Sequence, residues 1–351
     1  MRLLHCYGRL FKRSLHLKHD PLNIAFFGSG NFSVASLSKI LELQKRCPER
    51  VSSIKVITRS IKPSGRYMKT FSELPVSEFA MKHNIPILRA DSSSEISGLM
   101  ENNKFNLTIA VSYGKLIPAA FLQTCTYGGL NVHPSLLPKY SGSSPIQYAL
   151  LNDDKRTGVT VQSLHPTKFD HGKIIAQSGE MEIEHNDNFD SLSDRLAQEG
   201  GALLSEVIDK GLFLNTSLPN VYERSLAPKI DKSKSQALWD AYTARQIQRL
   251  NDALGPIFTF INTRTKKKGR IVEEKKRVIL NPVTELSIHD DLQLENPGDF
   301  ALVKEGLCIK CKTGYVVSKK IKLQTRGEET PEKFIGSYHK TVGDMPQQFI
   351  N

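Results

Sequence analysis

Short apolar segments alternate with helical patterns over the first half of the chain, beginning at Asn23–Phe27 and followed by a Gly28–Gly30 turn. The turn leads into a helical pattern over residues 32–43 and then into a second apolar segment, Ile54–Thr58. A strand–helix–strand unit of this kind implies two parallel strands joined by a right-handed crossover. The same alternation continues with strands expected at residues 86–88, 107–111, 130–132, 159–164 and 174–184, and with a closing helix at residues 188–210. The pattern predicts an open, mostly parallel, Rossmann-like α/β sheet spanning residues 21–212.

The composition and the apolar periodicity of the sequence change after residue 212. Residues 213–235 contain Ser, Pro and Lys without apolar periodicity, which is typical of a linker. Beyond the linker, a helical segment at residues 239–253 precedes short β patterns at residues 257–262, 277–280, 300–304, 307–311 and 315–321. Several short strands separated by Gly and Pro predict a small β-barrel or sandwich, which we expect to form a second domain over residues 236–351.

The first twenty residues differ from the rest of the chain in composition. They contain five Lys or Arg residues interleaved with Leu and Phe, and their first acidic residue is Asp20. A basic amphipathic segment without a continuous apolar core is typical of a mitochondrial transit peptide. We therefore expect residues 1–20 to direct the chain to the mitochondrial matrix, with an ordinary basic tail as the alternative.

The charge and the cysteines limit the classes of partner. A formal net charge of +12 favours an anionic partner, with nucleic acid before a membrane surface. No apolar run approaches the roughly 20 residues that span a bilayer. The five cysteines are dispersed, which favours a reducing compartment. Cys308 and Cys311 have the spacing of half a zinc site, so we interpret them as structural and expect no metal.

The turn after the first expected strand, Gly28-Ser-Gly30-Asn-Phe-Ser33, is an imperfect dinucleotide-binding motif. Its third glycine is replaced by Ser33, and the second strand ends at Arg59 where an acidic residue would hold a ribose. A structural strand-to-helix turn is the favoured interpretation.

Three side chains suited to acyl transfer lie within residues 131–174. Asn131 and His133 are two positions apart at the end of an expected strand, so they face the same side. Asp170 follows the next strand and precedes Gly172, where a simple Asp-x-Gly turn is the alternative role. An amide donor, an imidazole and a carboxylate are the groups needed to move an acyl group onto an amine.

The same window carries a longer ordered pattern. It reads Asn131-Val-His133, Ser135-Leu-Leu-Pro138, Pro145-Ile-Gln147, Thr157-Gly-Val-Thr160 and Asp170-His-Gly172. This pattern resembles the formyltransferase family that uses 10-formyltetrahydrofolate, and most closely its members that act on methionyl-tRNA. The resemblance extends from residue 23 to about residue 330 and is weakest beyond the linker. It implies that the second domain is OB-like.

The resemblance also implies roles for individual residues. Asn131, His133 and Asp170 match the catalytic residues, with Asn131 and His133 donating to the oxyanion and Asp170 orienting the imidazole. The residues implied to contact the folate are Ser135, Leu136, Leu137, Pro138 and Tyr113. The residues implied to contact tRNA are Arg66 and Lys69 in the long connection between residues 59 and 74, and Lys266, Lys267, Lys268 and Arg270 in the second domain. Tyr67 and Met68 depart from the basic run that the family has beside Arg66, and a solvated surface loop is the alternative.

The implied reaction is transfer of the formyl group of 10-formyltetrahydrofolate, a co-substrate, to the α-amino group of initiator methionyl-tRNA, catalysed by a monomer without a metal. Two alternatives stay open. One is a formyltransferase acting on a small amine, which would not need the basic second domain. The other is a nucleic-acid-binding protein with a degenerate enzyme domain, against which the intact set of Asn131, His133 and Asp170 argues.

Overall fold

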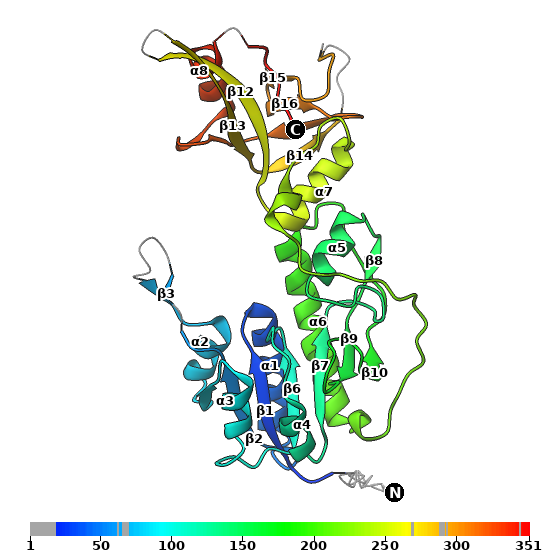
Figure 1. Cartoon of the computed structure of the whole chain (residues 1–351). Helices are drawn as coiled ribbons and strands as arrows, with labels where there is room; N and C mark the ends of the chain where they lie inside the picture. The colour runs from blue at the N-terminus through cyan, green and yellow to red at the C-terminus, as the bar shows by residue number, and fades with distance from the viewer. Residues whose placement is uncertain are drawn as a thin grey trace, which may run out of the picture.

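The computed structural model describes residues 19–61, 63–64, 70–267, 270–287, 292, 294–343 and 345–351, with the side chains of residues 64, 70 and 265–267 left out. Figure 1 shows an α/β domain formed by the first part of the chain and a β-rich domain formed by the last third. The expected fold class, a mostly parallel α/β sheet followed by a smaller β domain, is confirmed.

The first domain is built on one sheet, to which the described residues contribute seven strands in the order β10-β9-β7-β6-β1-β2-β5. These strands are β1 (Leu22–Gly28), β2 (Val51–Thr58), β5 (Ile87–Arg89), β6 (Leu107–Val111), β7 (Gly129–His133), β9 (Thr160–Ser163) and β10 (Ile174–Gln177). β9 runs antiparallel to both β7 and β10, and the other neighbours are parallel. The carboxyl ends of the parallel strands therefore meet at one edge, which faces the second domain in Figure 1.

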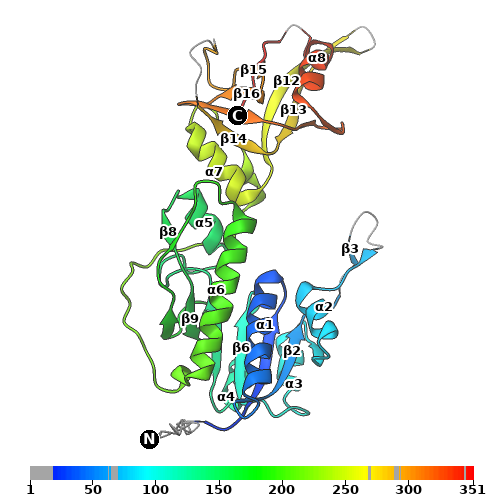
Figure 2. The same ribbon diagram turned by 180° about the vertical axis from the view of Figure 1, so that it is seen from behind.

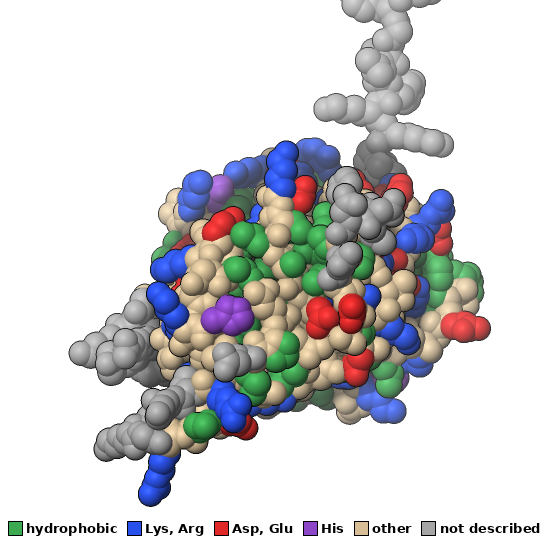
Figure 3. All heavy atoms as spheres, turned by 90° about the horizontal axis from the view of Figure 1, so that it is seen from above, with side chains coloured by type: hydrophobic (Ala, Val, Ile, Leu, Met, Phe, Trp, Pro, Cys, Tyr) green, Lys and Arg blue, Asp and Glu red, His purple; other side chains and the backbone are tan. Residues whose placement is uncertain are grey.

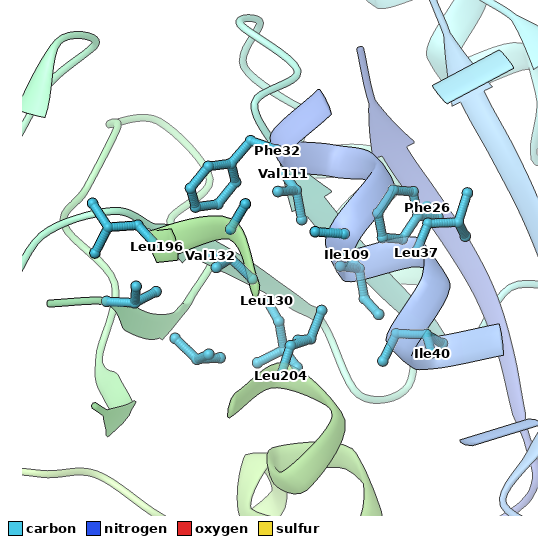
Figure 4. Packing of buried hydrophobic residues seen from close by; sticks show 14 of the residues in the cluster. Phe26, Phe32, Leu37, Ile40, Ile109, Val111, Leu130, Val132, Leu196 and Leu204 are labelled. Carbon is cyan, nitrogen blue, oxygen red and sulfur yellow. The ribbon is translucent and has the colours of Figure 1, made fainter. Parts of the chain in front are cut away.

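Helices cover both faces of this sheet (Figures 1 and 2). They are α1 (Asn31–Arg46), α2 (Pro75–Lys82), α3 (Ser93–Gly98), α4 (Ala119–Thr124), α5 (Pro145–Leu151) and α6 (Phe189–Asp209). α1 and α6 pack side by side, and their apolar faces bury Leu37 and Leu196 against Phe26 and Val132 of the sheet (Figure 4). Burial of each such side chain stabilises the fold by roughly 1.5–3 kcal/mol.

Two adjacent glycines let α6 approach α1 and the sheet closely. A Cβ atom on Gly200 would lie 2.9 Å from Val132 Cγ1, and one on Gly201 would lie 2.9 Å from the carbonyl oxygen of Ala35. Both distances are shorter than van der Waals contact, so any larger residue would push the helix outward.

The expected strand at residues 174–184 is divided in the structure. β10 ends at Gln177, and Met181–Glu182 forms a separate strand, β11, that pairs with β8 (Arg156–Thr157). The interruption falls at Ser178 and Gly179. The Ser178 hydroxyl accepts a hydrogen bond from the Val159 N–H at 2.9 Å and so turns the chain away from the sheet. Short strands β3 (Pro63–Ser64) and β4 (Thr70–Phe71) pair within the long connection before α2.

The described chain begins with a residue that is packed into the first domain. The ring of His19 is 8% exposed and lies against the rings of Tyr127 and Phe213, with centroid separations of 5.8 and 5.2 Å. The Asp20 N–H donates to the Tyr127 hydroxyl at 2.9 Å. Residues 19 and 20 therefore belong to the folded domain, whereas residues 1–18 lie outside the described residues.

The segment between the domains returns along the length of the first domain. After α6 and the short helix η2 (Leu212–Leu214), residues 215–231 form neither helix nor continuous strand. Figures 1 and 2 show this segment passing beside β9 and β10 on its way to the second domain. It touches the sheet edge through a bridge between Leu218 and Ile174. A second short helix, η3 (Lys232–Ser235), ends it.

The second domain contains two helices and two four-stranded antiparallel sheets among its described residues. Its elements are α7 (Ala244–Leu254), β12 (Ile257–Lys267), β13 (Arg270–Leu280), β14 (Val283–Leu286), β15 (Phe300–Val303), β16 (Gly306–Lys310), β17 (Tyr315–Ser318), β18 (Ile321–Leu323), β19 (Glu328–Glu329) and α8 (Pro331–Val342). One sheet has the order β12-β13-β18-β19 and the other β14-β17-β16-β15. β12 and β13 are longer than the apolar patterns indicated, because the two strands stay paired through residues that are mostly polar or charged, such as Glu273 and Glu274.

Cys308 and Cys311 are free, fully buried thiols in and next to β16. Burial raises the pKa of each thiol to about 12. They are therefore neutral side chains of the core. Within the described residues, no group of His, Cys, Asp and Glu has a metal-binding arrangement, and no helix is long and apolar enough to cross a membrane.

Charged side chains from α7 join the two domains. Arg249, 2% exposed, donates through Nε to Asp153 Oδ1 at 2.9 Å and through its other nitrogens to the carbonyl oxygens of Asp187 and Glu184 at 2.9 and 3.3 Å. Arg245 donates to the same Asp153 oxygen at 2.7 Å. Asp153 follows α5 in the first domain, so this network fixes the orientation of α7 on that domain.

Candidate active site

β7 places two of the expected catalytic residues at the carboxyl edge of the sheet. Asn131 and His133 project from the same face of this strand, between β6 and β9. His133 is 5% exposed and Asn131 is half-buried. No hydrogen bond from the Asn131 side chain to another described residue is formed, so its N–H donors remain available to a ligand.

The connection between β9 and β10 brings Asp170 to the same place. Asp170 Oδ1 lies 3.4 Å from His133 Nδ1, and both side chains are more than nine-tenths buried. Asp170 has a φ of 53°, a left-handed conformation that Asp tolerates better than most residues. Gly172 is required in this turn because a Cβ atom there would lie 1.6 Å from the carbonyl oxygen of Ser163. The structure therefore brings Asn131, His133 and Asp170 together.

The loop of residues 140–144, here called the 140–144 loop, fixes both titratable side chains. The carbonyl oxygen of Tyr140 lies 3.0 Å from His133 Nε2 and can only accept, so Nε2 carries a hydrogen. The N–H of Gly142 donates to Asp170 Oδ2 at 2.8 Å. With Nε2 occupied, Nδ1 is the ring nitrogen that remains to interact with Asp170 and with a ligand.

Gln162 is a site residue that the sequence reasoning missed. It lies on β9, is 2% exposed, and donates through Nε2 to Asp170 Oδ1 at 2.9 Å. Its Oε1 accepts the N–H of Gly172 at 3.2 Å, so one amide holds both the carboxylate and the turn behind it. The signal in the sequence that would have identified it is an amide side chain two positions after Thr160 in an expected strand, on the same face as Thr160 and opposite the apolar Val161.

A cavity of about 600 Å³ opens in front of these residues. It is lined by residues 110 and 112–117, Leu122, residues 131–134, 142–143 and 145, and residues 162–165 and 168–170. Its rim carries two exposed apolar side chains, Leu116 at 36% and Phe169 at 59% exposure. A largely apolar cavity with a few convergent polar groups is the usual form of a small-molecule site.

Tyr113, expected to contact the folate, lies in the cavity wall. Its ring is buried against Phe27 and its hydroxyl donates to the carbonyl oxygen of Ala90 at 3.1 Å. Burial, with a smaller contribution from Asp91, raises the pKa of Tyr113 to about 12, so the hydroxyl stays protonated as a donor.

Ser135, Leu136, Leu137 and Pro138, also expected to contact the folate, lie behind the cavity and do not line it. Thr160 holds this turn, because its hydroxyl donates to the Ser135 carbonyl at 2.7 Å and accepts the Leu137 N–H at 3.0 Å. Ser135, Leu136 and Leu137 are 1%, 5% and 2% exposed. In this conformation the turn supports the wall that carries His133.

The residues expected to contact tRNA fall mostly outside the described part of the chain. Arg66, Lys69 and Lys268 are not described, and Lys266 and Lys267 lie in β12 with their side chains undescribed. Arg270 is exposed at the start of β13. Figures 1 and 2 both place the β3–β4 pair and the outer ends of β12 and β13 on the same side of the molecule.

Comparison with known proteins agrees with this architecture. A family model described as formyl transferase matches residues 22–208. The mitochondrial methionyl-tRNA formyltransferase of Saccharomyces cerevisiae is 30% identical over 94% of this chain and 93% of that enzyme. The methionyl-tRNA formyltransferase of Caldicellulosiruptor saccharolyticus is 31% identical over 92% of this chain and 99% of that enzyme.

A solved structure shares the fold at lower identity. The sugar 3N-formyl transferase WlaRD, solved in the presence of dTDP and 5-N-formyl-THF, has a TM-score of 0.55, is 17% identical, and is matched over 88% of this chain and 100% of that one. The family model covers the domain that carries Asn131, His133 and Asp170, and the relatives extend the similarity through the second domain. The chain therefore belongs to the formyl transferase family.

Proposed function

We propose that this chain transfers the formyl group of 10-formyltetrahydrofolate to the α-amino group of initiator methionyl-tRNA for mitochondrial translation. The observation that carries the proposal is the convergence of Asn131, His133 and Asp170 at a cavity of about 600 Å³. It occurs in a chain similar over 94% of its length to a mitochondrial enzyme named for this reaction. The family resemblance supplies the co-substrate, and formyl-THF accompanies the WlaRD structure.

The chemistry divides among the three side chains. The methionyl nitrogen attacks the formyl carbon, a C–N bond forms, and the bond from that carbon to N10 of the folate breaks. The Asn131 amide donates to the formyl oxygen as it becomes an oxyanion, and one such donor typically lowers the barrier by about 3 kcal/mol. The attacking amine gives up one proton and N10 of the folate takes one up as its bond to carbon breaks. His133 accepts and returns this proton at Nδ1, because Nε2 is held by the Tyr140 carbonyl. Asp170 stabilises the ring while it carries positive charge.

The folate occupies the cavity between Tyr113 and Phe169. Its flat pterin ring suits the apolar surface of Leu116 and Phe169 at the rim, while backbone groups of residues 112–117 meet its polar edge. Residues 135–138 act by holding the wall that carries His133. No metal is needed for this reaction, because side-chain donors stabilise the oxyanion.

The acceptor is a tRNA, bound by basic side chains on one side of the molecule. In the sequence, Arg66 and Lys69 lie between β3 and β4, and Lys266–Lys268 lie at the end of β12 and just after it. The described strands of both pairs lie on that side, and Arg270 is exposed at the start of β13. Figure 3, which views the second domain from its outer end, shows Lys and Arg side chains around most of the rim. Each phosphate neutralised by such a side chain adds affinity that falls with salt.

The acceptor assay tests this function directly. The full chain is incubated with labelled 10-formyltetrahydrofolate and either initiator methionyl-tRNA or an amino-sugar nucleotide. We expect formyl-methionyl-tRNA as the product, with kcat/KM falling steeply between 50 and 200 mM salt because phosphate contacts are screened. Labelled sugar without labelled tRNA would establish the small-amine alternative, and tRNA binding without transfer to either acceptor would establish a degenerate enzyme domain.

Import into the mitochondrial matrix is supported by the basic N-terminal segment and by the mitochondrial yeast relative. We place the processing site before His19, because residues 19 and 20 pack against Tyr127 and Phe213. The mature enzyme acts as a monomer, which its mass in solution tests.

The N-terminal boundary gives a prediction about stability. A chain starting at Pro21 loses the buried ring of His19 and the Asp20 hydrogen bond, about 1–2 kcal/mol. We expect its melting temperature to lie about 2–8 °C below that of a chain starting at Lys18. Calorimetry measures the difference. Identical melting temperatures would show that residues 19 and 20 do not stabilise the domain, and the boundary of the transit peptide would then stay at residue 20.

A further inference from the structure

Three consecutive residues of the linker, Ser225–Ala227, here called the linker strap, pair with the 140–144 loop. The backbone hydrogen bonds run from Ser141 N–H to Ser225 O at 2.9 Å, from Ala227 N–H to Ser141 O at 2.8 Å, and from Ser144 N–H to Ala227 O at 3.0 Å. The Ser225 hydroxyl accepts the N–H of Tyr140 at 2.9 Å. The linker therefore adds a short strand-like segment to the loop that borders the active site.

The other side of the same loop contacts the catalytic pair. Tyr140 receives the strap's side-chain hydrogen bond on its N–H and presents its carbonyl oxygen to His133 Nε2 at 3.0 Å. Gly142, between the strap-bonded residues 141 and 144, donates to Asp170 Oδ2 at 2.8 Å. One layer of backbone thus separates the linker strap from both titratable side chains.

The backbones of the linker strap and the 140–144 loop are in close contact, with no gap between them. A Cβ atom on Gly142 would lie 2.4 Å from the carbonyl oxygen of Ala227, and Gly142 has a φ of 137°. Ala227 is fully buried. A shift of the strap is therefore transmitted to the loop rather than absorbed by a gap between them.

The 140–144 loop is also held by contacts outside the linker strap, so the effect of the strap on the active site can be tested without unfolding the loop. The Tyr140 hydroxyl donates to Asp154 Oδ2 and accepts from Asn152 Nδ2, both at 2.8 Å. This anchor keeps the loop in the fold when one strap contact is lost. Removing the Ser225 hydroxyl should thus misplace the backbone of residues 140–142 without unfolding the domain.

We propose that the linker strap is a positioning element of the active site, in which Ser225 sets the Tyr140 carbonyl that holds the His133 ring. This inference rests on the proposed formyl transfer for its kinetic test. Ser225 acts through the 140–144 loop and need not touch substrate. A segment of the linker is thereby part of the catalytic apparatus of the first domain.

The experiment compares Ser225→Ala, Ser225→Thr and Ser217→Ala in the full chain. Ser217 is an exposed serine of the same linker and serves as the matched control. For Ser225→Ala we expect kcat for formyl transfer to fall about tenfold, or about 1.4 kcal/mol, with both KM values within twofold. Ser225→Thr keeps the hydroxyl and should restore most of kcat, and all three variants should melt within a few degrees of the parent chain.

A readout independent of turnover separates this inference from the proposed function. The His133 Nε2–H signal, assigned by NMR against a His133→Ala chain, should be protected from exchange in the parent and in Ser217→Ala and should broaden or vanish in Ser225→Ala. If the parent chain formylates no tRNA but the signal behaves in this way, the proposed function fails and the positioning role stands. An unchanged signal, or kcat within twofold of the parent with KM raised, would overturn the role of the strap.

Discussion

Asp170→Asn is expected to lower kcat for formyl transfer by about 10³-fold while leaving the fold intact. The substitution keeps the size of the side chain, and an Asn oxygen can still accept the Gly142 N–H. Its amide nitrogen takes the place of Oδ1, where it faces His133 Nδ1 and also the Nε2–H of Gln162, which loses the oxygen to which it donated. A positive charge that develops on the ring during the reaction then has no carboxylate beside Nδ1 to stabilise it.

The measurement is steady-state kinetics with methionyl-tRNA and folate, together with thermal unfolding. Asp194→Asn, on the exposed face of α6, is the matched control and should stay within twofold of the parent. His133→Ala should lose about as much activity as Asp170→Asn, and the double variant should lose little more, because the pair acts as a unit. More than a tenth of the parent kcat in Asp170→Asn would remove the carboxylate from the mechanism.

Arg249→Met is expected to destabilise the joint between the domains by about 3 kcal/mol. The substitution keeps the apolar stem but leaves the buried carbonyl oxygen of Asp187 without its guanidinium donor, and it leaves the carbonyl oxygen of Glu184 with the Asp187 N–H alone. It also removes one of the two guanidinium partners of Asp153. Calorimetry should show the first unfolding transition about 6–12 °C lower. Arg156→Met is the control, because its ion pair with Glu180 is exposed and such pairs contribute little.

The same network predicts a dependence of stability on pH. Burial acts to raise the pKa of Asp153, but hydrogen bonds and charge from Arg245 and Arg249 outweigh it and hold the pKa well below its usual range. A carboxyl with a depressed pKa in the folded state stabilises the fold above its unfolded pKa of about 3.9, and this contribution is lost as pH falls toward the folded value. The stability gap between the parent chain and Arg249→Met should thus narrow below about pH 4. A gap that is constant from pH 7 to pH 3 would contradict the assignment.

The sequence predicted elements whose signal is local. The alternation of apolar strands and helical patterns located the sheet, because strands buried on both faces are apolar throughout. The outer halves of β12 and β13 were missed because their sequence is mostly polar and charged, as in Thr265-Lys-Lys267, and shows no regular apolar alternation. α8 was missed although Thr330 and Pro331 mark its start and Phe334, Tyr338 and Val342 recur at helical spacing.

The candidate site also contains some features that the sequence predicts and others that it does not. Asn131, His133 and Asp170 could be predicted because their types and order form a recognisable pattern. The contacts that fix their geometry could not, since a backbone carbonyl such as that of Tyr140 carries no sequence signal and Ser225 lies 85 residues from its partner. Residues 135–138 show the converse: their pattern is distinctive, yet the structure places them behind the cavity wall.

The route of the linker also decides how this protein can be divided into fragments. α6 ends at the edge of the sheet remote from the active site, and the chain then returns past Leu218 and Ser225 before it enters the second domain. A break in the exposed stretch between residues 219 and 224 would leave Ser225–Ala227 covalently attached to the second domain. When the two fragments bind each other, Ser225–Ala227 of one would pair again with the 140–144 loop of the other and complete the wall of the active site. Recovery of enzyme activity would then measure how well the fragments reassemble.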